Sequence, residues 1–347
     1  MHRLQRSWAQ RGPWARLLLP VSWLYGSLWR LRALLYRTAF LRTEKLPVPV
    51  VIVGNLIAGG AGKTPAVRAV VDILQAHGRR PGIVSRGYGR HEQGVAEVET
   101  DSTAQRVGDE PLLLRLRSGV PVVVGRDRPA AARELLRRHP QVDVIVSDDG
   151  LQHLALARDV SVVVFDERGA GNGWLLPAGP LREPMPRSVG SATLVLYNAR
   201  SPSTPLPGFT ATRSLRGAVE LAHWWTGKAA DPRALQALVG RRVLAAAGVA
   251  QPERFFDMLR AAGLEIETLP LPDHHDYETP PWPSGTSDVV ITEKDAVKLR
   301  AERVAPTRVW VVALDFRPEA AFAEQLLKLL PPPPFTTPES AHGHSIA

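Results

Sequence analysis

A glycine-rich loop that ends in lysine and threonine carries the most specific chemical signal in the sequence. Gly59, Gly60 and Gly62 lie within the four residues that precede Lys63 and Thr64. Glycines let backbone N–H groups close around phosphate oxygens, a lysine here reaches the β- and γ-phosphates, and a threonine hydroxyl meets Mg²⁺. These residue types in this order predict a loop that binds the phosphates of a nucleotide, with Mg²⁺ at the threonine.

The elements on either side of the loop must hold it at the end of a strand. The β-branched run 50–53 predicts a buried strand, and the apolar-periodic run 66–74 predicts a helix. The usual motif has a glycine where this chain has Ile57, so a plain strand-to-helix turn is the alternative. The predicted nucleotide-binding residues are Ile57, Ala58, Gly59, Gly60, Ala61, Gly62, Lys63 and Thr64.

Carboxylates that follow a second apolar run are candidates for metal binding. Asp148 and Asp149 end the run 142–146, which predicts another buried strand. A hard cation such as Mg²⁺ prefers carboxylate oxygen, whereas Asp-Asp-Gly is also an ordinary turn sequence. With the glycine loop upstream, the metal role is favoured. The predicted metal ligands are Thr64, Asp148, Asp149 and Glu110.

A second acidic pair precedes a predicted helix. Asp109 and Glu110 come directly before the apolar run 112–116. They could cap that helix, hold a metal or accept a proton, and the residues alone leave these roles open.

Polar residues on three loops are candidates for substrate contacts or for orienting the groups above. Arg86 lies in a basic glycine-rich loop after strand 83–84, and a solvated arginine is the alternative. The long loop 168–186 is of a length that indicates either function or disorder. The candidates are Arg86, Gln152, His153, Arg182 and Glu183.

The charge and composition of the chain limit its function classes. The 347 residues include no cysteine, which excludes disulfides and cysteine-ligated zinc. Residues 1–45 contain eight Arg and one Lys against a single acid, so they carry nearly all of the net charge of +9. A nucleic-acid-binding protein would be expected to carry basic residues on its catalytic body, and no nucleic-acid partner is predicted.

The basic segment 1–45 is also rich in tryptophan. The uncharged run 17–29 has 13 residues, fewer than the approximately 20 that a spanning helix needs. Apolar residues, interfacial aromatics and arginines together predict one or two amphipathic helices in a membrane interface, with arginines on anionic headgroups. The alternative is a helix packed on the body of the protein itself. A signal peptide is disfavoured, because no clear small-residue cleavage site precedes the first predicted strand.

Alternation of strands and helices predicts an α/β protein of two units. We expect a P-loop NTPase-like parallel sheet core at 46–200, a linker region at 201–240 and a smaller parallel α/β domain at 241–330. A disordered tail is expected at 331–347.

Several linked motifs point to one family. They are Gly59-Gly60-Ala61-Gly62-Lys63-Thr64-Pro65, Ser85-Arg86-Gly87-Tyr88-Gly89, Gly108-Asp109-Glu110-Pro111, Asp148-Asp149-Gly150-Leu151-Gln152-His153, Leu176-Pro177-Ala178-Gly179-Pro180-Leu181-Arg182-Glu183-Pro184, Asp273-His274-His275 and Ile291-Thr292-Glu293-Lys294-Asp295. In this order they resemble the tetraacyldisaccharide 4′-kinase family, the lipid A kinases of Gram-negative bacteria.

The resemblance implies a reaction and a location. It implies MgATP-dependent phosphorylation of the 4′-hydroxyl of an acylated glucosamine disaccharide 1-phosphate, giving lipid IVA in lipopolysaccharide biosynthesis. It also implies a peripheral enzyme on the cytoplasmic face of the inner membrane, with two domains that close around the nucleotide.

The resemblance further implies that Asp109 and His274 form the pair that activates the sugar hydroxyl. A histidine of near-neutral pKa held by a carboxylate is a suitable base. His275 is the internal rival for that role. The alternative function is a membrane-associated P-loop switch ATPase without a lipid phosphoryl acceptor. Ala58 argues against it, because that group commonly has a lysine there.

Overall fold

The computed structural model describes residues 8–60 and 62–332. Three parts of the expectations above lie outside the described residues: the first seven residues of the basic segment, Ala61 of the glycine loop, and most of the expected disordered tail.

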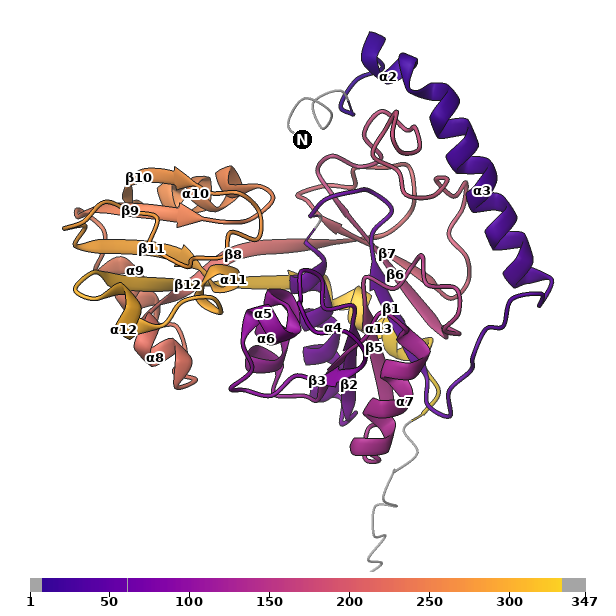
Figure 1. Cartoon of the computed structure of the whole chain (residues 1–347), viewed down its shortest axis with the longest axis horizontal. Coiled ribbons are helices and arrows are strands. Elements are labelled where there is room, and N and C mark those ends of the chain that lie inside the picture. Colours follow the sequence, from indigo (N-terminus) through magenta and orange to yellow (C-terminus); the bar gives the residue numbers. More distant parts are fainter. Residues whose placement is uncertain (1–7, 61, 333–347) are drawn as a thin grey trace, which may run out of the picture.

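The strands form a single sheet (Figure 1). Those of the first half are β1 (Val50–Gly54), β2 (Pro81–Ser85), β3 (Ala96–Glu97), β4 (Val122–Val124), β5 (Val144–Asp148), β6 (Val160–Asp166) and β7 (Thr193–Asn198). Those of the second half are β8 (Phe209–Glu220), β9 (Arg242–Ala247), β10 (Glu265–Pro270), β11 (Asp288–Thr292) and β12 (Arg308–Pro318). Across the described residues the sheet has 12 strands in the order β10-β9-β11-β12-β8-β7-β6-β1-β5-β2-β4-β3.

Helices pack on both faces of the sheet in the first half of the chain. They are α2 (Pro13–Leu17), α3 (Leu19–Arg37), α4 (Lys63–Ala76), α5 (Ala104–Val107), α6 (Asp109–Ser118), α7 (Arg128–Arg138), α8 (Leu221–Trp225), α9 (Pro232–Gln236), α10 (Pro252–Ala261), α11 (Glu293–Ala296), α12 (Ala301–Val304) and α13 (Ala320–Lys328).

The first half is the predicted parallel core. β1 pairs in parallel with β5 and β6, and β2 pairs in parallel with β4 and β5. The register aligns Val53 with Asp148, so the glycine loop after β1 and the aspartates after β5 emerge at one edge. The α/β fold class is confirmed, including a smaller unit in which β9, β10, β11 and β12 are parallel.

The range 201–240 contains more regular structure than the linker predicted there. β8 is a 12-residue strand that pairs antiparallel with β12 and, at its first residues, parallel with β7. The β8–β12 ribbon therefore connects the smaller unit, on the left in Figure 1, to the core on the right. Within the predicted linker, the residues that precede β8, 201–208, form no strand or helix.

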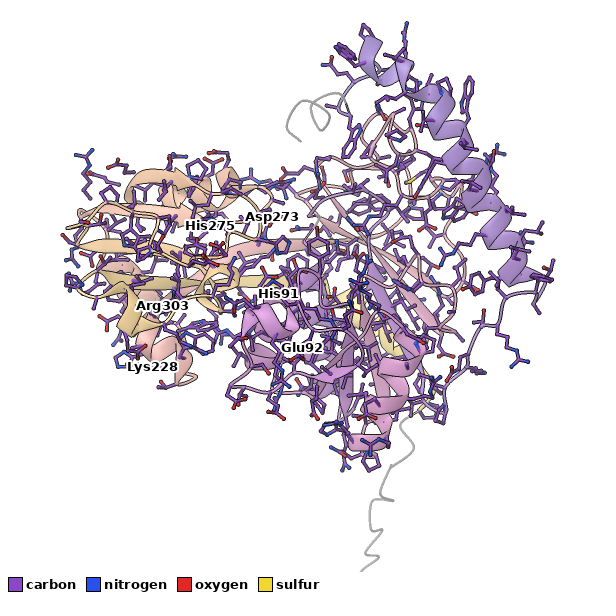
Figure 2. The ribbon with its side chains drawn as sticks, viewed as in Figure 1. His91, Glu92, Lys228, Asp273, His275 and Arg303 are labelled. Carbon is purple, nitrogen blue, oxygen red and sulfur yellow. The ribbon has the colours of Figure 1, made fainter. Side chains whose placement is uncertain are left out.

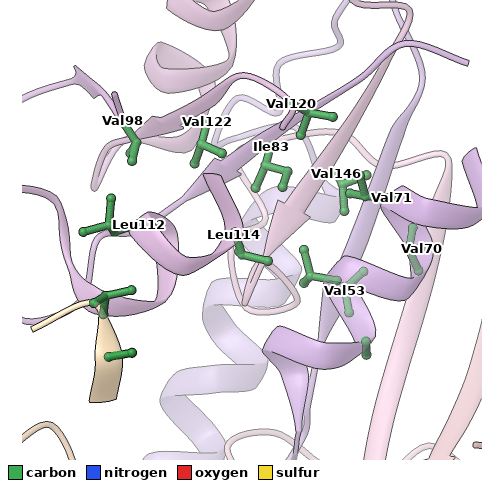
Figure 3. Packing of buried hydrophobic residues seen from close by; sticks show 14 of the residues in the cluster. Val53, Val70, Val71, Ile83, Val98, Leu112, Leu114, Val120, Val122 and Val146 are labelled. Atoms are coloured by element: carbon green, nitrogen blue, oxygen red, sulfur yellow. The ribbon is translucent and has the colours of Figure 1, made fainter. Parts of the chain in front are cut away.

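A branched aliphatic core fixes the two helices nearest the glycine loop. Val53, Val70 and Ile83 are fully buried, as is Leu112 on α6 (Figure 3). Each such side chain contributes about 1.5–3 kcal/mol through burial. Because α4 and α6 pack on the same core, the first residues of both helices are held near the same sheet edge.

Helices α2 and α3 lie along the side of the core opposite the smaller unit (Figure 1). Ser22 and Gly26 of α3 face the body, where the Ser22 hydroxyl donates to the carbonyl of Leu175 at 2.9 Å. The outer face is apolar: Trp14, Trp23 and Leu24 are 74, 68 and 61% exposed. In the part of the chain that the structure describes, no helix is both long enough and apolar enough to cross a membrane.

Candidate active site

A cavity of about 600 Å³ lies where the strand ends of the core meet the smaller unit. The core lines it with the glycine loop and with residues that end β2, β5 and β7, among them Ser85, Asp148 and Asn198. The smaller unit lines it from the β8–β12 ribbon, α10 and the start of α11. Its volume is in the range of ligand sites, and its place at the carboxyl ends of parallel strands is typical of α/β proteins.

The glycine loop requires a glycine at position 62, because the side chain of Asn198 packs against its backbone. Gly62 has φ +84°, and a Cβ there would come within 2.1 Å of the Asn198 amide. Lys63 follows at the first position of α4, where its ammonium lies 3.8 Å from Asp149 and 3.3 Å from the side-chain oxygen of Asn55. The lysine is thus held at the mouth of the loop by two acceptors that a phosphate could supplement.

The predicted nucleotide-binding stretch divides into two parts. Gly59, Gly60, Gly62, Lys63 and Thr64 line the cavity. Ile57 and Ala58 do not line it. Ile57 is buried and forms an isolated antiparallel β-bridge with Leu181, and the N–H of Ala58 donates to the carbonyl of Pro180. These two residues therefore attach the loop to the segment that carries Arg182.

The two aspartates after β5 have different surroundings. One carboxylate oxygen of Asp148 accepts from Ser85, whereas the other is buried without a partner among the described residues. Burial, reinforced by the negative charges of Glu110 and Asp149, raises the pKa of Asp148 to about 7. Asp149 instead accepts from Arg182 at 3.0 Å; burial acts to raise its pKa, but Lys63 and Arg182 lower it overall.

The structure brings Asp109 and His274 together across the two units. Nδ1 of His274 lies 2.8 Å from Oδ2 of Asp109. Burial acts to raise the pKa of Asp109, but the hydrogen bond from His274 and nearby ammonium groups lower it overall. The same hydrogen bond raises the pKa of His274, against the opposing effect of burial. His275 instead packs edge-on against Tyr277, so His274 is the member of the His-His sequence that contacts the carboxylate.

The other candidates fall into two positions. Arg86 and Arg182 line the cavity. Gln152 lies behind them, where its amide donates to Glu183 at 3.0 Å and its oxygen lies 3.4 Å from Arg182. Gln152 and Glu183 therefore orient Arg182.

His153 does not line the cavity. Burial, with the positive charge of Arg128 next in effect, lowers the pKa of His153 to about 4. A histidine held neutral in this way is suited to packing beside cations, so it contributes no charge to the site.

Helix α3 supports this arginine segment from outside. The Tyr25 hydroxyl donates to the carbonyl of Arg182 at 2.6 Å, and Arg32 donates to the carbonyl of Gln152 at 3.1 Å. Helix α3, which has the exposed apolar face, is thus in direct contact with the backbone of Arg182, one of the residues that line the cavity.

Several cavity residues were not predicted as site residues. Asn198 ends β7, and Lys294 is the second residue of α11, within a motif that was recognised without assigning Lys294 a role. Arg213 lies on the unpredicted β8. Lys294 could have been found from its motif. Asn198 and Arg213 carried no sequence signal, because a single polar residue at a strand end or in a strand is common.

The glutamate before Lys294 ties α11 to the core. Glu293 contacts Arg117 of α6 and lies 4.0 Å from Arg68 of α4. It also accepts from the indole of Trp224 at 3.3 Å. The acidic residue at the start of α11 is therefore held by both core helices nearest the cavity.

Among the described residues, no three His, Asp or Glu side chains come together in the manner of a metal centre built by protein alone. Mg²⁺ commonly keeps waters and takes only one or two protein carboxylates along with phosphate oxygens. The unpartnered oxygen of Asp148 fits that limited role better than Asp149 or Glu110, which are paired with Arg182 and Lys294.

Comparison with known proteins agrees over nearly the whole chain. The family model described as tetraacyldisaccharide-1-P 4′-kinase matches residues 14–331. A tetraacyldisaccharide 4′-kinase from Methylibium petroleiphilum is 58% identical, over 95% of this chain and 93% of that protein. One from Leptothrix cholodnii is 56% identical, over 95% and 96%.

A solved structure has the same fold. LpxK from Aquifex aeolicus, crystallised in complex with ATP, superposes with a TM-score of 0.75 at 28% identity, covering 91% of this chain and 99% of that one. From the match over residues 14–331 and these close relatives, the chain belongs to the tetraacyldisaccharide-1-P 4′-kinase family.

Proposed function

We propose that this protein transfers the γ-phosphoryl group of ATP to the 4′-hydroxyl of a tetraacylated disaccharide 1-phosphate, the lipid A precursor. The observation that carries the proposal is that Lys63 with its glycine loop and the Asp109–His274 pair line one cavity. A phosphate donor and a group that receives a hydroxyl proton are the two requirements of a kinase.

ATP is the proposed donor, with its phosphates on the glycine loop. The relative solved with ATP supports this, as does the position of Gly59, Gly60 and Gly62 on the wall of the cavity. Lys63 neutralises charge on the β- and γ-phosphates, and the N-terminus of α4 adds a favourable partial charge.

Mg²⁺ is the proposed metal, with Thr64 and Asp148 as the residues that hold it. Asp148 brings a buried carboxylate oxygen without a partner among the described residues, and Thr64 lines the same cavity. When bound, Mg²⁺ supplies positive charge to the phosphate oxygens. A cation there would also lower the pKa of Asp148, against the burial and the negative charges that raise it.

The Asp109–His274 pair is proposed to receive the proton of the sugar hydroxyl. The 4′-oxygen forms a bond to the γ-phosphorus while the bond from that phosphorus to the β,γ-bridging oxygen breaks, and ADP leaves with that electron pair. The hydroxyl proton moves to the pair, where the Asp109 carboxylate stabilises the positive charge that the imidazole gains. Arg86 and Arg182, on the wall of the same cavity, are placed to contact phosphate or sugar oxygens.

Contact between the two units is proposed to assemble the site and exclude water. The smaller unit contributes His274, and its residue Ala250 lies so near the glycine loop that a Cβ on Gly60 would be 3.1 Å away. Exclusion of water prevents ATP hydrolysis before the lipid is in place.

The exposed apolar face of α2 and α3 is proposed to rest on the cytoplasmic face of the inner membrane. Trp14, Trp23 and Leu24 would enter the interface, and nearby arginines such as Arg30 and Arg37 would meet anionic headgroups. The acyl chains of the substrate then stay in the bilayer while its sugar reaches the cavity. The protein is thus a peripheral enzyme in this proposal.

The alternative function, a P-loop switch ATPase, can be distinguished from a lipid kinase by experiment. It would consume ATP without a lipid product. We expect ATP consumption to rise at least about tenfold when the acylated disaccharide is added in mixed micelles, because the acceptor replaces excluded water. Lys63→Ala should abolish this rise. ATP consumption that is the same with and without the lipid would support the switch instead.

A further inference from the structure

Lys294 is the charged side chain of the smaller unit that lies closest to the proposed proton-accepting pair. Its ammonium is 2.9 Å from Glu110, 3.2 Å from Asp273 and 3.4 Å from Nε2 of His274. Figure 2 labels Asp273 on the side of the smaller unit that faces the core. Lys294 thus contacts the outer nitrogen of the same imidazole whose inner nitrogen contacts Asp109.

The short helix α11 is anchored so that this lysine has little freedom. Thr292 caps its first turn by accepting from the N–H of Asp295. The Asp295 carboxylate in turn lies 3.2 Å from the N–H of Gly248, whose carbonyl accepts from the N–H of His274. The backbone of His274 and the helix that carries Lys294 are therefore connected through one buried aspartate.

Hydrogen-bond chemistry fixes the role of each ring nitrogen. A lysine ammonium carries three donors and no acceptor, so Nε2 of His274 must offer its lone pair to Lys294. Asp109 is a carboxylate that only accepts, so Nδ1 carries the proton that His274 donates. The imidazole is then neutral, with one proton on Nδ1.

We propose that Lys294 is a positioning residue that keeps Nε2 of His274 unprotonated, so that the Asp109–His274 pair is free to receive the proton of the acceptor hydroxyl. The inference rests on the proposed kinase function, since it assigns the state of the pair in that reaction. The groups that face the imidazole are Asp109 on α6, Asp273 on its own loop, Lys294 on α11 and the ring of Tyr88 at 5.2 Å.

Removal of the ammonium reverses the balance around the ring. Asp109 and Asp273 are both negative, and Asp273 lies 3.8 Å from Nε2. Without Lys294 these two carboxylates favour a doubly protonated imidazolium, which holds no lone pair for a further proton. The pair would then be unable to act until the pH is high enough to deprotonate it.

The test compares Lys294→Met with wild type across pH. The acid limb of the kcat profile should move upward by about one to two pH units, the size of the effect of a charge at this distance. At pH 7 this lowers kcat by about 10–100-fold, and kcat recovers to within about threefold near pH 9. KM for MgATP should stay within about threefold, because Lys294 is not among the predicted phosphate contacts.

Two further variants serve as controls. Lys294→Arg keeps the positive charge and should retain most of the wild-type profile. Lys228→Met removes a lysine from the exposed end of the smaller unit, near α8 and away from the core in Figure 2, and should leave the profile unchanged.

A spectroscopic measurement on wild type keeps the proposal falsifiable if Lys294→Met fails to fold. Histidine ¹⁵N chemical shifts at pH 7, with His274 identified by loss of its signal in His274→Gln, report which nitrogen carries a proton. We expect a proton on Nδ1 and none on Nε2 in wild type, and protons on both in Lys294→Met. A protonated Nε2 in wild type would overturn the proposal, as would a loss of kcat in Lys294→Met that is equal at every pH.

These readouts separate the inference from the function on which it rests. The ¹⁵N measurement needs neither ATP nor lipid. If wild type has the predicted protonation but transfers no phosphate to lipid, the proposed function fails. If wild type is an active lipid kinase and the pH profile of Lys294→Met is the same as that of wild type, the inference alone fails.

Discussion

Nδ1 of His274 lies 2.8 Å from Oδ2 of Asp109, although the two residues are 165 positions apart and belong to different units of the fold. His274 is held in a left-handed backbone conformation with φ +62°, which few residues other than glycine adopt. Such conformations persist where the surrounding structure fixes them, and they are concentrated at functional sites. The contact is therefore the clearest sign that the two units form one site.

Replacement of either member of this pair should slow the chemical step. His274→Gln and Asp109→Asn are each expected to lower kcat by about 10²–10⁴-fold, with KM for MgATP changed by less than about threefold. The double variant should be little slower than the worse single variant, because the two groups act as a unit. The matched control is His275→Gln, and steady-state kinetics with the lipid acceptor provide the measurement. Near-normal kcat in either single variant would remove that residue from the reaction.

Asp148 and Asp149 should differ in their effect on the metal requirement. Asp148→Asn is expected to raise the Mg²⁺ concentration for half-maximal rate by at least about tenfold, because one carboxylate oxygen of Asp148 has no partner among the described residues. Asp149→Asn should chiefly raise KM for ATP, because Asp149 positions Lys63 and Arg182. Titration of activity with Mg²⁺ at saturating ATP distinguishes them, with the exposed Asp101→Asn as control. Equal metal dependence in both variants would contradict the assignment.

The apolar face of α3 can be tested without disturbing its contacts with the body. Deletion of the segment would also remove the Tyr25 contact with Arg182, so substitution at exposed positions is cleaner. Trp23→Glu combined with Leu24→Glu should reduce sedimentation with anionic vesicles and turnover of lipid by about tenfold or more, while ATP binding stays within about twofold. Equal loss of ATP binding and lipid turnover would indicate a structural role for this face.

A matched change on the inner face of α3 should have the opposite profile. Gly26→Leu would clash with Leu175, because a Cβ on Gly26 would already lie 2.7 Å from its side chain. We expect a lower midpoint of thermal unfolding, by several degrees, with vesicle binding retained. A variant of unchanged stability would show that α3 does not pack on the body as described.

His153 should make the folded state sensitive to acid. Its pKa is about 4 in the folded protein, against an ordinary value of 6.5, because it is half-buried and feels the positive charge of Arg128. As the pH falls from about 6.5 toward 4, the unfolded chain binds a proton that the folded state refuses, so stability is lost over that window. His153→Gln should therefore show a smaller decrease in urea-unfolding free energy between pH 7 and pH 5 than wild type. The control is the exposed His91→Gln, and equal decreases in all three proteins would contradict the assignment.

Much of the core was predictable because buried parallel strands leave a strong pattern. Runs such as 50–53 and 142–146 are continuously apolar, and polar residues such as Asp148 stand out where a run ends. Since the carboxyl ends of parallel strands meet at one edge of a sheet, the sequence alone is enough to place the glycine loop and the aspartates together.

The remainder depended on tertiary contacts that the sequence does not encode locally. β8 was missed because it contains Arg213 and Arg216 among its apolar residues and has one of its ends outside the core, so its alternation is weak. The supporting contact of Lys294 with His274 was missed because it joins helix α11 to a separate loop of the smaller unit. Ile57 was predicted to bind nucleotide from its motif position, but its side chain is buried against the segment near Leu181.

Transfer of labelled phosphate is the most direct test of the central claim that the cavity passes a phosphoryl group from ATP to a lipid alcohol. Wild-type protein would be incubated with [γ-³²P]ATP, Mg²⁺ and vesicles that contain the tetraacylated disaccharide 1-phosphate. We expect label in the lipid at the 4′-position, with little inorganic phosphate and no transfer by Lys63→Ala. Release of inorganic phosphate at one rate with or without that lipid, and no label in the lipid fraction, would contradict it.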